Sequence, residues 1–299
     1  MKKVVHNGIL CFFKPEGVTS FQALSGLKKI FGTNKVGHTG TLDKFATGVM
    51  IICIGSYTRL AQYVVGKSKG YTAVVKMGVE TDTLDPEGST VKEGDLPDLL
   101  KIEESIRGFI GEISQIPPRY SAIHVNGKRA HDRIRNGEDF EMHPRDVRID
   151  SIDLISYENG LLSIDVQCSK GTYIRSLARD IAEAAGSCGS LAALSRTRVG
   201  TVHSKDCNTE EEIRENPVAC LMTGGTSVQK ILDLPIIILK PEHEFSFYNG
   251  KSVSEIWFKN DIIIRSENGT FLVADENDRI AGIVQKEYDR VTYACVFPR

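Results

Sequence analysis

The sequence offers one carboxylate, set in a loop of small residues, as its clearest candidate for chemistry. Residues 37–49 read Gly-His-Thr-Gly-Thr-Leu-Asp-Lys-Phe-Ala-Thr-Gly-Val, and Asp43 is the one acid among them. Small residues let a backbone turn tightly and let a ligand approach closely. The apolar run at 49–54 that follows is typical of a buried strand. Asp43 is therefore a candidate catalytic group; the alternative is a turn whose aspartate hydrogen-bonds only its own backbone.

Charge is unevenly distributed along the chain, although the formal net charge is only −2. Residues 80–104 hold nine acids and two bases, whereas residues 119–135 hold five bases and one acid. Residues 170–200 hold five bases and two acids. Two basic segments in a nearly neutral protein are compatible with a localised phosphate-binding face, and two solvated surfaces are the alternative.

The composition is that of an ordinary soluble globular protein, with 41% hydrophobic and 25% charged residues. The apolar run at 9–13 is too short for a secretory signal, and no apolar segment is long enough to span a bilayer. The seven cysteines are scattered, and none has Cys-x-x-Cys spacing. We therefore expect a cytoplasmic protein with reduced, mostly buried thiols rather than disulfides or a zinc site.

Hydrophobic patterns predict the elements that must hold Asp43 in place. Strands are expected at 9–13, 49–54, 71–77 and 162–168. A capping box formed by Thr19 and Gln22 predicts a helix. The apolar face of this helix is expected to comprise Phe21, Leu24, Leu27 and Ile30. Further helices are expected after an N-cap at Ser56, near 103–109, at 174–185 with Gly186 closing it, and after 209.

Two regions depart from this pattern. Residues 115–145 have no clean period and are basic, so we interpret them as a long surface excursion of the kind that is usually functional or disordered. From about residue 232, short apolar runs alternate with turn residues, at 236–239, 262–264, 271–273, 280–284 and 291–296. This pattern predicts a small all-β appendage. The expected domains are 1–230, with an insertion at about 119–145, and 231–299.

Five segments carry motifs that occur in one order. They are Lys-Pro-Glu-Gly-Val-Thr-Ser at 14–20, the loop at 37–49, Tyr71 followed by Thr-Asp-Thr-Leu-Asp-Pro-Glu-Gly at 81–88, Gln-Ile-Pro-Pro-Arg-Tyr-Ser-Ala at 115–122 with Asn-Gly-Lys at 126–128, and Cys-Ser-Lys-Gly-Thr-Tyr-Ile-Arg at 168–175. Together they resemble the bacterial tRNA pseudouridine-55 synthases of the TruB type. The resemblance covers about residues 8–200, and the C-terminal appendage resembles a PUA-type RNA-binding domain more loosely.

The resemblance implies an α+β fold: a mixed, largely antiparallel central sheet flanked by helices, with a small PUA-like β domain. It implies an isomerase that converts uridine 55 in the T loop of tRNA to pseudouridine without a cofactor or metal. The implied partner is tRNA, with no obligatory protein partner, and the protein is expected to be a monomer. A non-catalytic RNA-binding or RNA-folding protein and an unrelated Asp-dependent hydrolase are the alternatives.

The resemblance also assigns the chemistry to three residues. Asp43 is expected to act as nucleophile, or as electrostatic stabiliser and acid/base partner on an elimination route through a glycal. Burial raises the pKa of a carboxylate, and Arg175 is expected to keep Asp43 ionised through a charge-assisted pair. Tyr71 would offer the detached base an aromatic face and a hydroxyl for proton transfer. Taken alone, Tyr71 and Arg175 would be an ordinary strand core residue and an ordinary surface arginine.

Further residues are expected to bind the RNA or support the loop. His38 would fill the space that the flipped base leaves, and Leu194 would line the apolar side of the pocket. Phosphates would be bound by Lys128, Arg129 and Arg133. Lys14 and Pro15 would brace the loop, and Asp82 and Asp85 would serve a turn rather than a cation. The sequence departs from the family at 44–45, where Lys-Phe stands in place of the usual Pro-Leu.

Overall fold

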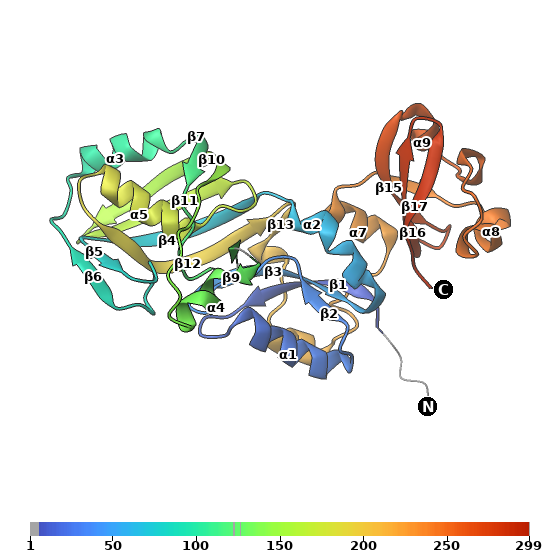
Figure 1. Ribbon diagram of the computed structural model, residues 1–299. Coiled ribbons are helices and arrows are strands. Elements are labelled where there is room, and N and C mark those ends of the chain that lie inside the picture. The colour runs from blue at the N-terminus through green and yellow to red at the C-terminus, as the bar shows by residue number, and fades with distance from the viewer. Residues whose placement is uncertain (1–5, 122, 126, 299) are drawn as a thin grey trace.

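The computed structural model describes residues 6–121, 123–125 and 127–298. A sheet of nine strands dominates this part of the chain (Figure 1). In order across it, the strands are β1 (Gly8–Lys14), β3 (Thr47–Ile54), β12 (Gly189–Val199), β4 (Lys69–Met77), β11 (Leu161–Cys168), β10 (Arg145–Glu158) and β7 (Gly111–Gln115), with β2 (Val36–His38) on β3 and β13 (Val202–His203) on β12. The pairing of β12 with β3 is parallel and the others are antiparallel. The predicted mixed, largely antiparallel sheet is confirmed.

Strands β1 and β3 are buried on both faces of the sheet. Successive side chains of a strand point to opposite faces, so each strand supplies two cores. Leu10, Phe12, Met50, Ile52 and Ile54 belong to one core, and Ile9, Cys11, Val49, Ile51 and Cys53 belong to the other. This explains why the sequence shows continuous apolar runs here rather than alternation.

Helices on one face of the sheet complete the first core. They are α1 (Ser20–Phe31), α3 (Leu99–Gly108), α5 (Ile174–Ala184) and α6 (Glu210–Glu215). The capping box of Thr19 and Gln22 is confirmed. Of the predicted apolar face of α1, Leu27 is buried and Leu24 and Ile30 pack against the first core, whereas Phe21 is wrongly assigned because it is 72% exposed. Ser20 points inwards instead, since its hydroxyl bonds the backbone of Leu42 in the Asp43 loop.

The other face is covered by a 3₁₀ turn at Gly55–Leu60, by α2 (Gln62–Val65) and by α7 (Gly225–Leu232). The prediction that Ser56 caps a helix is wrong. The Ser56 hydroxyl has no hydrogen-bond partner among the described residues, while its amide donates to the side chain of Asn7. Gly55 turns the chain at a φ of +65°, which leaves Ser56 inside the 3₁₀ turn rather than before a helix.

The C-terminal part is built on a four-stranded sheet. Its strands, in order, are β14 (Ile236–Ile238), β15 (Asn268–Ala274), β16 (Ile280–Glu287) and β17 (Arg290–Val296). The all-β prediction is wrong in detail, because the segment also holds α8 (Glu244–Tyr248) and α9 (Ile262–Arg265). The run at 262–264 lies in α9, and three apolar residues are too few to show a strand or helix period.

The two parts share one core rather than being joined only by a linker. Leu272, Ile283 and Phe297 pack in the same cluster as β1 and β3. The rings of Tyr57 and Phe297 lie 5.2 Å apart, and the Arg59 guanidinium lies 4.7 Å from the Phe297 ring centre. The predicted domain boundary after residue 230 falls inside α7, and the division into two domains stays a prediction.

The irregular segment after residue 115 is confirmed as an excursion from the sheet. Gln115 at the end of β7 pairs directly with Arg145 at the start of β10, so the chain leaves and re-enters at one point. Between them lie β8 (His124–Val125), β9 (Lys128–Arg129) and α4 (Ala130–Arg135). A separate hairpin, β5 (Val79–Thr81) and β6 (Thr90–Glu93), carries the acidic turn at 81–88.

Candidate active site

A cavity of about 540 Å³ opens where the loop after β2, the turn at 81–88, the start of α5 and strand β12 meet. Asp43, Tyr71, Arg175 and Leu194 all line it. The structure therefore brings together, from four separate segments, three predicted catalytic residues and one predicted pocket residue.

Arg175 binds Asp43 with two nitrogens. Its Nε lies 3.0 Å from Asp43 Oδ2, and its second terminal nitrogen donates to Asp43 Oδ1 at 3.4 Å. Arg175 is the second residue of α5, and the start of that helix is held by Gln115, which bonds both the amide and the carbonyl of Tyr173. Bidentate pairing of this kind fixes the orientation of a carboxylate as well as its charge.

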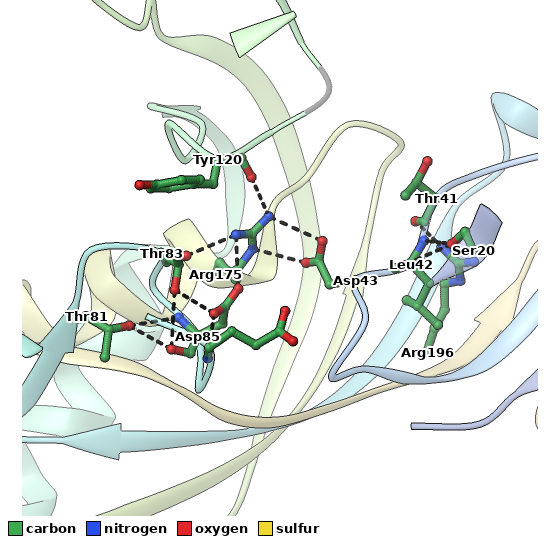
Figure 2. A network of polar contacts seen from close by, with 11 residues as sticks. Ser20, Thr41, Leu42, Asp43, Thr81, Thr83, Asp85, Tyr120, Arg175 and Arg196 are labelled. Carbon is green, nitrogen blue, oxygen red and sulfur yellow. Dashed lines mark hydrogen bonds and ion pairs between the residues drawn. The ribbon is translucent and has the colours of Figure 1, made fainter. Parts of the chain in front are cut away.

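Asp85 is a second carboxylate on the same arginine. The other terminal nitrogen of the Arg175 guanidinium, Nη1, donates to Asp85 Oδ2 at 3.2 Å and to the carbonyl of Thr83 at 3.0 Å (Figure 2). A further donation reaches the carbonyl of Tyr120 at 2.9 Å. Arg175 is 6% exposed and Asp85 4%. Arg175 is therefore not the ordinary surface arginine of the alternative interpretation, and it joins three loops around Asp43.

The surroundings of Asp43 favour its protonated, neutral form more than water favours that form of an exposed aspartate. Burial raises the pKa of Asp43 above its ordinary value, and the neighbouring Asp85 and Glu87 act in the same direction. Arg175 and Lys14 lower the Asp43 pKa, but they offset only part of the effect of burial. The ionised carboxylate thus depends on its cationic neighbours.

Tyr71 and Leu194 reach the cavity from adjacent strands. Tyr71 on β4 faces Arg196 on β12, and Leu194 faces Ala73 one pleat away. Tyr71 is 7% exposed, and burial raises the pKa of its phenol. The phenol therefore stays protonated near neutral pH, which suits it to stacking and to donating a hydrogen bond rather than to acting as a base.

Two side chains, Arg196 and Ser20, hold the backbone of the Asp43 loop. Arg196, which is 3% exposed, donates to the carbonyls of Gly40 and Thr41 at 3.2 Å and of Val49 at 2.7 Å. The Ser20 hydroxyl bonds the amide and the carbonyl of Leu42 (Figure 2). These contacts fix the backbone before and after Asp43.

Glycine is required where the loop enters β3. Gly48 has a φ of +114°, and a Cβ at that position would come within 2.2 Å of the Arg196 carbonyl oxygen. Only glycine combines that backbone conformation with so close an approach.

The predicted bracing role of Lys14 is confirmed by its contacts. This fully buried ammonium donates to the carbonyls of Pro15, Val18 and Lys44 at 2.8, 2.6 and 3.3 Å. Burial lowers the pKa of Lys14 to about 8, and Asp43 acts to raise it. Lys14 thus ties the N-terminal turn to the Asp43 loop and adds a positive charge near the carboxylate.

His38 lies at the end of β2 and does not line the cavity. Burial lowers the pKa of its imidazole, and its Nδ1 atom has no hydrogen-bond partner among the described residues. A neutral ring with an unused nitrogen is compatible with stacking on a base, so the predicted role of His38 stays a prediction.

Two of the three predicted phosphate-binding residues, Lys128 and Arg133, pair with one acid of the same excursion. Glu138 pairs with Lys128 and with Arg133, both at 2.9 Å. These bonds lower the pKa of Glu138. Arg133 and Arg119 lie near the ring of Phe140. The backbone of Arg129 belongs to β9, but its side chain lies outside the described structure.

Asp82 and Asp85 accept hydrogen bonds that stabilise the turn at 81–88, as predicted. Asp82 accepts from the amide of Ser89, and Asp85 accepts from Glu87 and from the hydroxyl of Thr83. Sequence reasoning nevertheless missed that Asp85 also binds Arg175.

No group of three or more potential metal-binding side chains is found in the part of the chain that the structure describes. Nor does any helix there have the length and apolar character to cross a membrane.

Sequence reasoning also missed Arg196 and Lys69, which line the cavity. Lys69 is buried two residues before Tyr71 on β4, and burial lowers its pKa to about 8. The available signal was the strand period, since residues two apart share a face of a strand.

The seven cysteines are all free, and five are buried, as expected.

Comparison with known proteins places this arrangement in a family. A model described as the N-terminal domain of TruB family pseudouridylate synthases matches residues 28–174. A protein named tRNA pseudouridine synthase B from Borreliella afzelii is 46% identical over 205 residues, covering 68% of this chain and 73% of the relative. Its namesake from Francisella philomiragia is 35% identical over 288 residues, covering 95% of each.

Solved structures agree on the fold. A chain in the crystal structure of a Cbf5-Nop10-Gar1 complex superimposes with a TM-score of 0.73 at 21% identity, covering 97% of this chain and 85% of that one. A chain in the structure of an H/ACA RNP bound to a substrate RNA gives the same TM-score at 19% identity. The identity to relatives over most of the chain shows that this protein belongs to the TruB family of pseudouridylate synthases.

Proposed function

We propose that this protein isomerises uridine 55 in the T loop of tRNA to pseudouridine, with Asp43 as the catalytic carboxylate. The observation that carries the proposal is the bidentate pair of Asp43 and Arg175 inside a cavity that also presents Tyr71. The relatives' names support tRNA as the substrate, and the motif resemblance supports the position in the T loop.

The reaction breaks the bond between N1 and C1′, rotates the uracil and joins C5 to C1′. A proton leaves C5 and N1 gains one, so no redox partner is required. Positive charge develops at C1′ as the base leaves, and an ionised carboxylate beneath it captures or stabilises that charge, as in glycoside hydrolysis. Asp43 does this either as nucleophile or as stabiliser and acid/base partner on a route through a glycal. Tyr71 provides a face on which the free base stacks.

Binding requires that the uridine leave the folded T loop, at a cost of roughly a few kcal/mol. His38 fills the vacated space in this proposal. Lys128, Arg129 and Arg133 contact phosphates from the excursion, after Lys128 and Arg133 exchange Glu138 for RNA. The protein acts as a cytoplasmic monomer with no obligatory protein partner.

The test is release of tritium from tRNA labelled at C5 of its uridines. Wild-type protein is expected to release tritium from the T-loop position, and the Asp43→Asn variant is expected to release none while still binding tRNA. Release by Asp43→Asn would refute the role of Asp43. Binding without release by the wild-type protein would instead identify a non-catalytic RNA-binding protein.

A further inference from the structure

Lys44 and Glu87 form an ion pair at the mouth of the cavity. Lys44 Nζ lies 3.0 Å from Glu87 Oε1, both side chains line the cavity, and they are 50% and 44% exposed. The pair lies where the sequence has lysine in place of the proline that is usual in this family. The neighbouring departure, Phe45, is explained by burial: it is 8% exposed and packs in the first core.

The backbones that carry this pair are fixed. The carbonyl of Lys44 accepts from the amide of Gly17 at 2.9 Å and from Lys14 at 3.3 Å. The amide of Glu87 donates to Asp85 Oδ1 at 3.0 Å. The two side chains therefore extend from anchored loops, and they can separate without disturbing the catalytic carboxylate.

Lys44 differs from every other cation that the structure shows lining the cavity. Arg175 and Arg196 are buried and bonded to carboxylates or carbonyls of the loops. Lys69 is buried and donates to the carbonyls of Val65 and Lys67. Lys44 alone among the described lining cations combines exposure with a partner that is itself exposed. An exposed pair contributes little to stability, so exchanging that partner costs little.

When a nucleotide places its C1′ atom over Asp43, the phosphates attached to the same ribose lie at the cavity mouth. Lys44 follows Asp43 directly in sequence and presents its ammonium at this mouth. Glu87 occupies this ammonium in the free protein, so a phosphate must compete with the Glu87 carboxylate for Lys44. The cavity mouth thus carries one group that attracts the substrate backbone and one that opposes it.

We propose that Lys44 is a substrate-binding residue that contacts a phosphate flanking the flipped nucleotide, and that Glu87 is its counter-ion in the free protein. The proposal rests on the proposed function, because it takes the nucleotide at Asp43 as given. Substrate entry then exchanges the carboxylate of Glu87 for a phosphate oxygen on Lys44. The two residues have opposite effects on RNA binding, although they are partners in the free protein.

The experiment measures the dissociation constant of a fluorescent T-arm RNA as a function of salt, in an Asp43→Asn background that prevents turnover. Lys44→Gln is expected to weaken binding several-fold and to reduce the slope of log affinity against log salt by about one. Glu87→Gln is expected to tighten binding. The double variant Lys44→Gln/Glu87→Gln is expected to match Lys44→Gln alone. Lys44→Arg, which keeps the charge, is expected to restore the slope.

Matched controls remove the same charges from the exposed face of α3, with Lys101→Gln and Glu104→Gln, and are expected to leave binding nearly unchanged. Weakening by both cavity-mouth variants would show that the pair only braces the rim, and would overturn the proposal. A double variant that binds more tightly than Lys44→Gln would show that Glu87 acts by long-range repulsion and not through Lys44, and would overturn its role as counter-ion. Tritium release by the wild-type protein is measured alongside, since its absence refutes the proposed function separately.

Discussion

Arg175 is the residue on which most of the site's geometry depends. It contacts Asp43, Asp85 and the carbonyls of Thr83 and Tyr120, which come from three different loops. A buried guanidinium with all these partners has no freedom to turn away from Asp43. The same contacts place a second carboxylate near the first, which makes the protonation of Asp43 sensitive to both neighbours.

The pH dependence of the reaction tests this balance. Because the proposed chemistry needs ionised Asp43 and its pKa is raised, kcat/KM is expected to fall as the pH drops through that raised value. Arg175→Met removes the group that lowers the Asp43 pKa most, so the acid limb is expected to move to higher pH. Asp85→Asn removes a group that raises the Asp43 pKa, so the limb is expected to move to lower pH.

The measurement is the pH profile of tritium release for the three proteins under single-turnover conditions. Thermal unfolding of each variant serves as the control for folding. Shifts of the acid limb in the same direction for both variants would contradict the assigned electrostatic roles.

At the scale of elements, the excursion at 116–144 carries its own acids next to its bases. Glu138 holds Lys128 and Arg133, and Asp139 pairs with Arg119 at 2.9 Å. Phosphates must compete with these carboxylates, so the basic charge counted in the sequence overstates the charge available to RNA.

Removing Glu138 is therefore expected to strengthen RNA binding. In Glu138→Gln, Lys128 and Arg133 lose their internal partner, so T-arm RNA is expected to bind several-fold more tightly at low salt, with a steeper salt dependence. Glu141→Gln, an exposed acid of the same excursion, is the matched control and is expected to have little effect. Weaker binding by Glu138→Gln would show that the internal pairs instead hold the excursion in its RNA-binding shape.

The sequence predicted the segments of the site better than their connections. The motifs around Asp43, Tyr71 and Arg175 are recognisable in the sequence. Apolar patterns also predict the strand after the Asp43 loop, the strand that carries Tyr71 and the helix that carries Arg175. The link from Arg175 to Asp85 was missed because it joins residues 90 positions apart through tertiary packing. The three apolar residues at 262–264 were misassigned because so short a run carries no period.

At the scale of the whole molecule, the two sheets are expected to unfold together. Phe297 is 2% exposed and packs with Tyr57 in a cluster that includes residues of both parts. The protein has one tryptophan, Trp257, in the separate core of the C-terminal part, and its fluorescence therefore reports on that part. Far-UV circular dichroism reports on the helices and strands of both parts.

The urea transitions followed by these two probes are expected to coincide, as two-state behaviour requires. Phe297→Ala is expected to lower the midpoint, at a cost of about 3–5 kcal/mol. Exposed Phe245→Ala in the same part is the control and is expected to change stability by less than about 0.5 kcal/mol. A fluorescence transition that precedes the circular dichroism transition in the wild-type protein would show independent domains.

Because the excursion leaves and re-enters the sheet at one point, its RNA preference can change separately from the reaction centre. Gln115 and Arg145 are ladder partners, so the sheet itself holds the ends of the intervening segment together. Its length and sequence are therefore free to vary without a change of register in β7 or β10. The limit is Tyr120, whose carbonyl binds Arg175. Segments grafted beyond residue 121 are a route to new RNA preferences on an unchanged reaction centre.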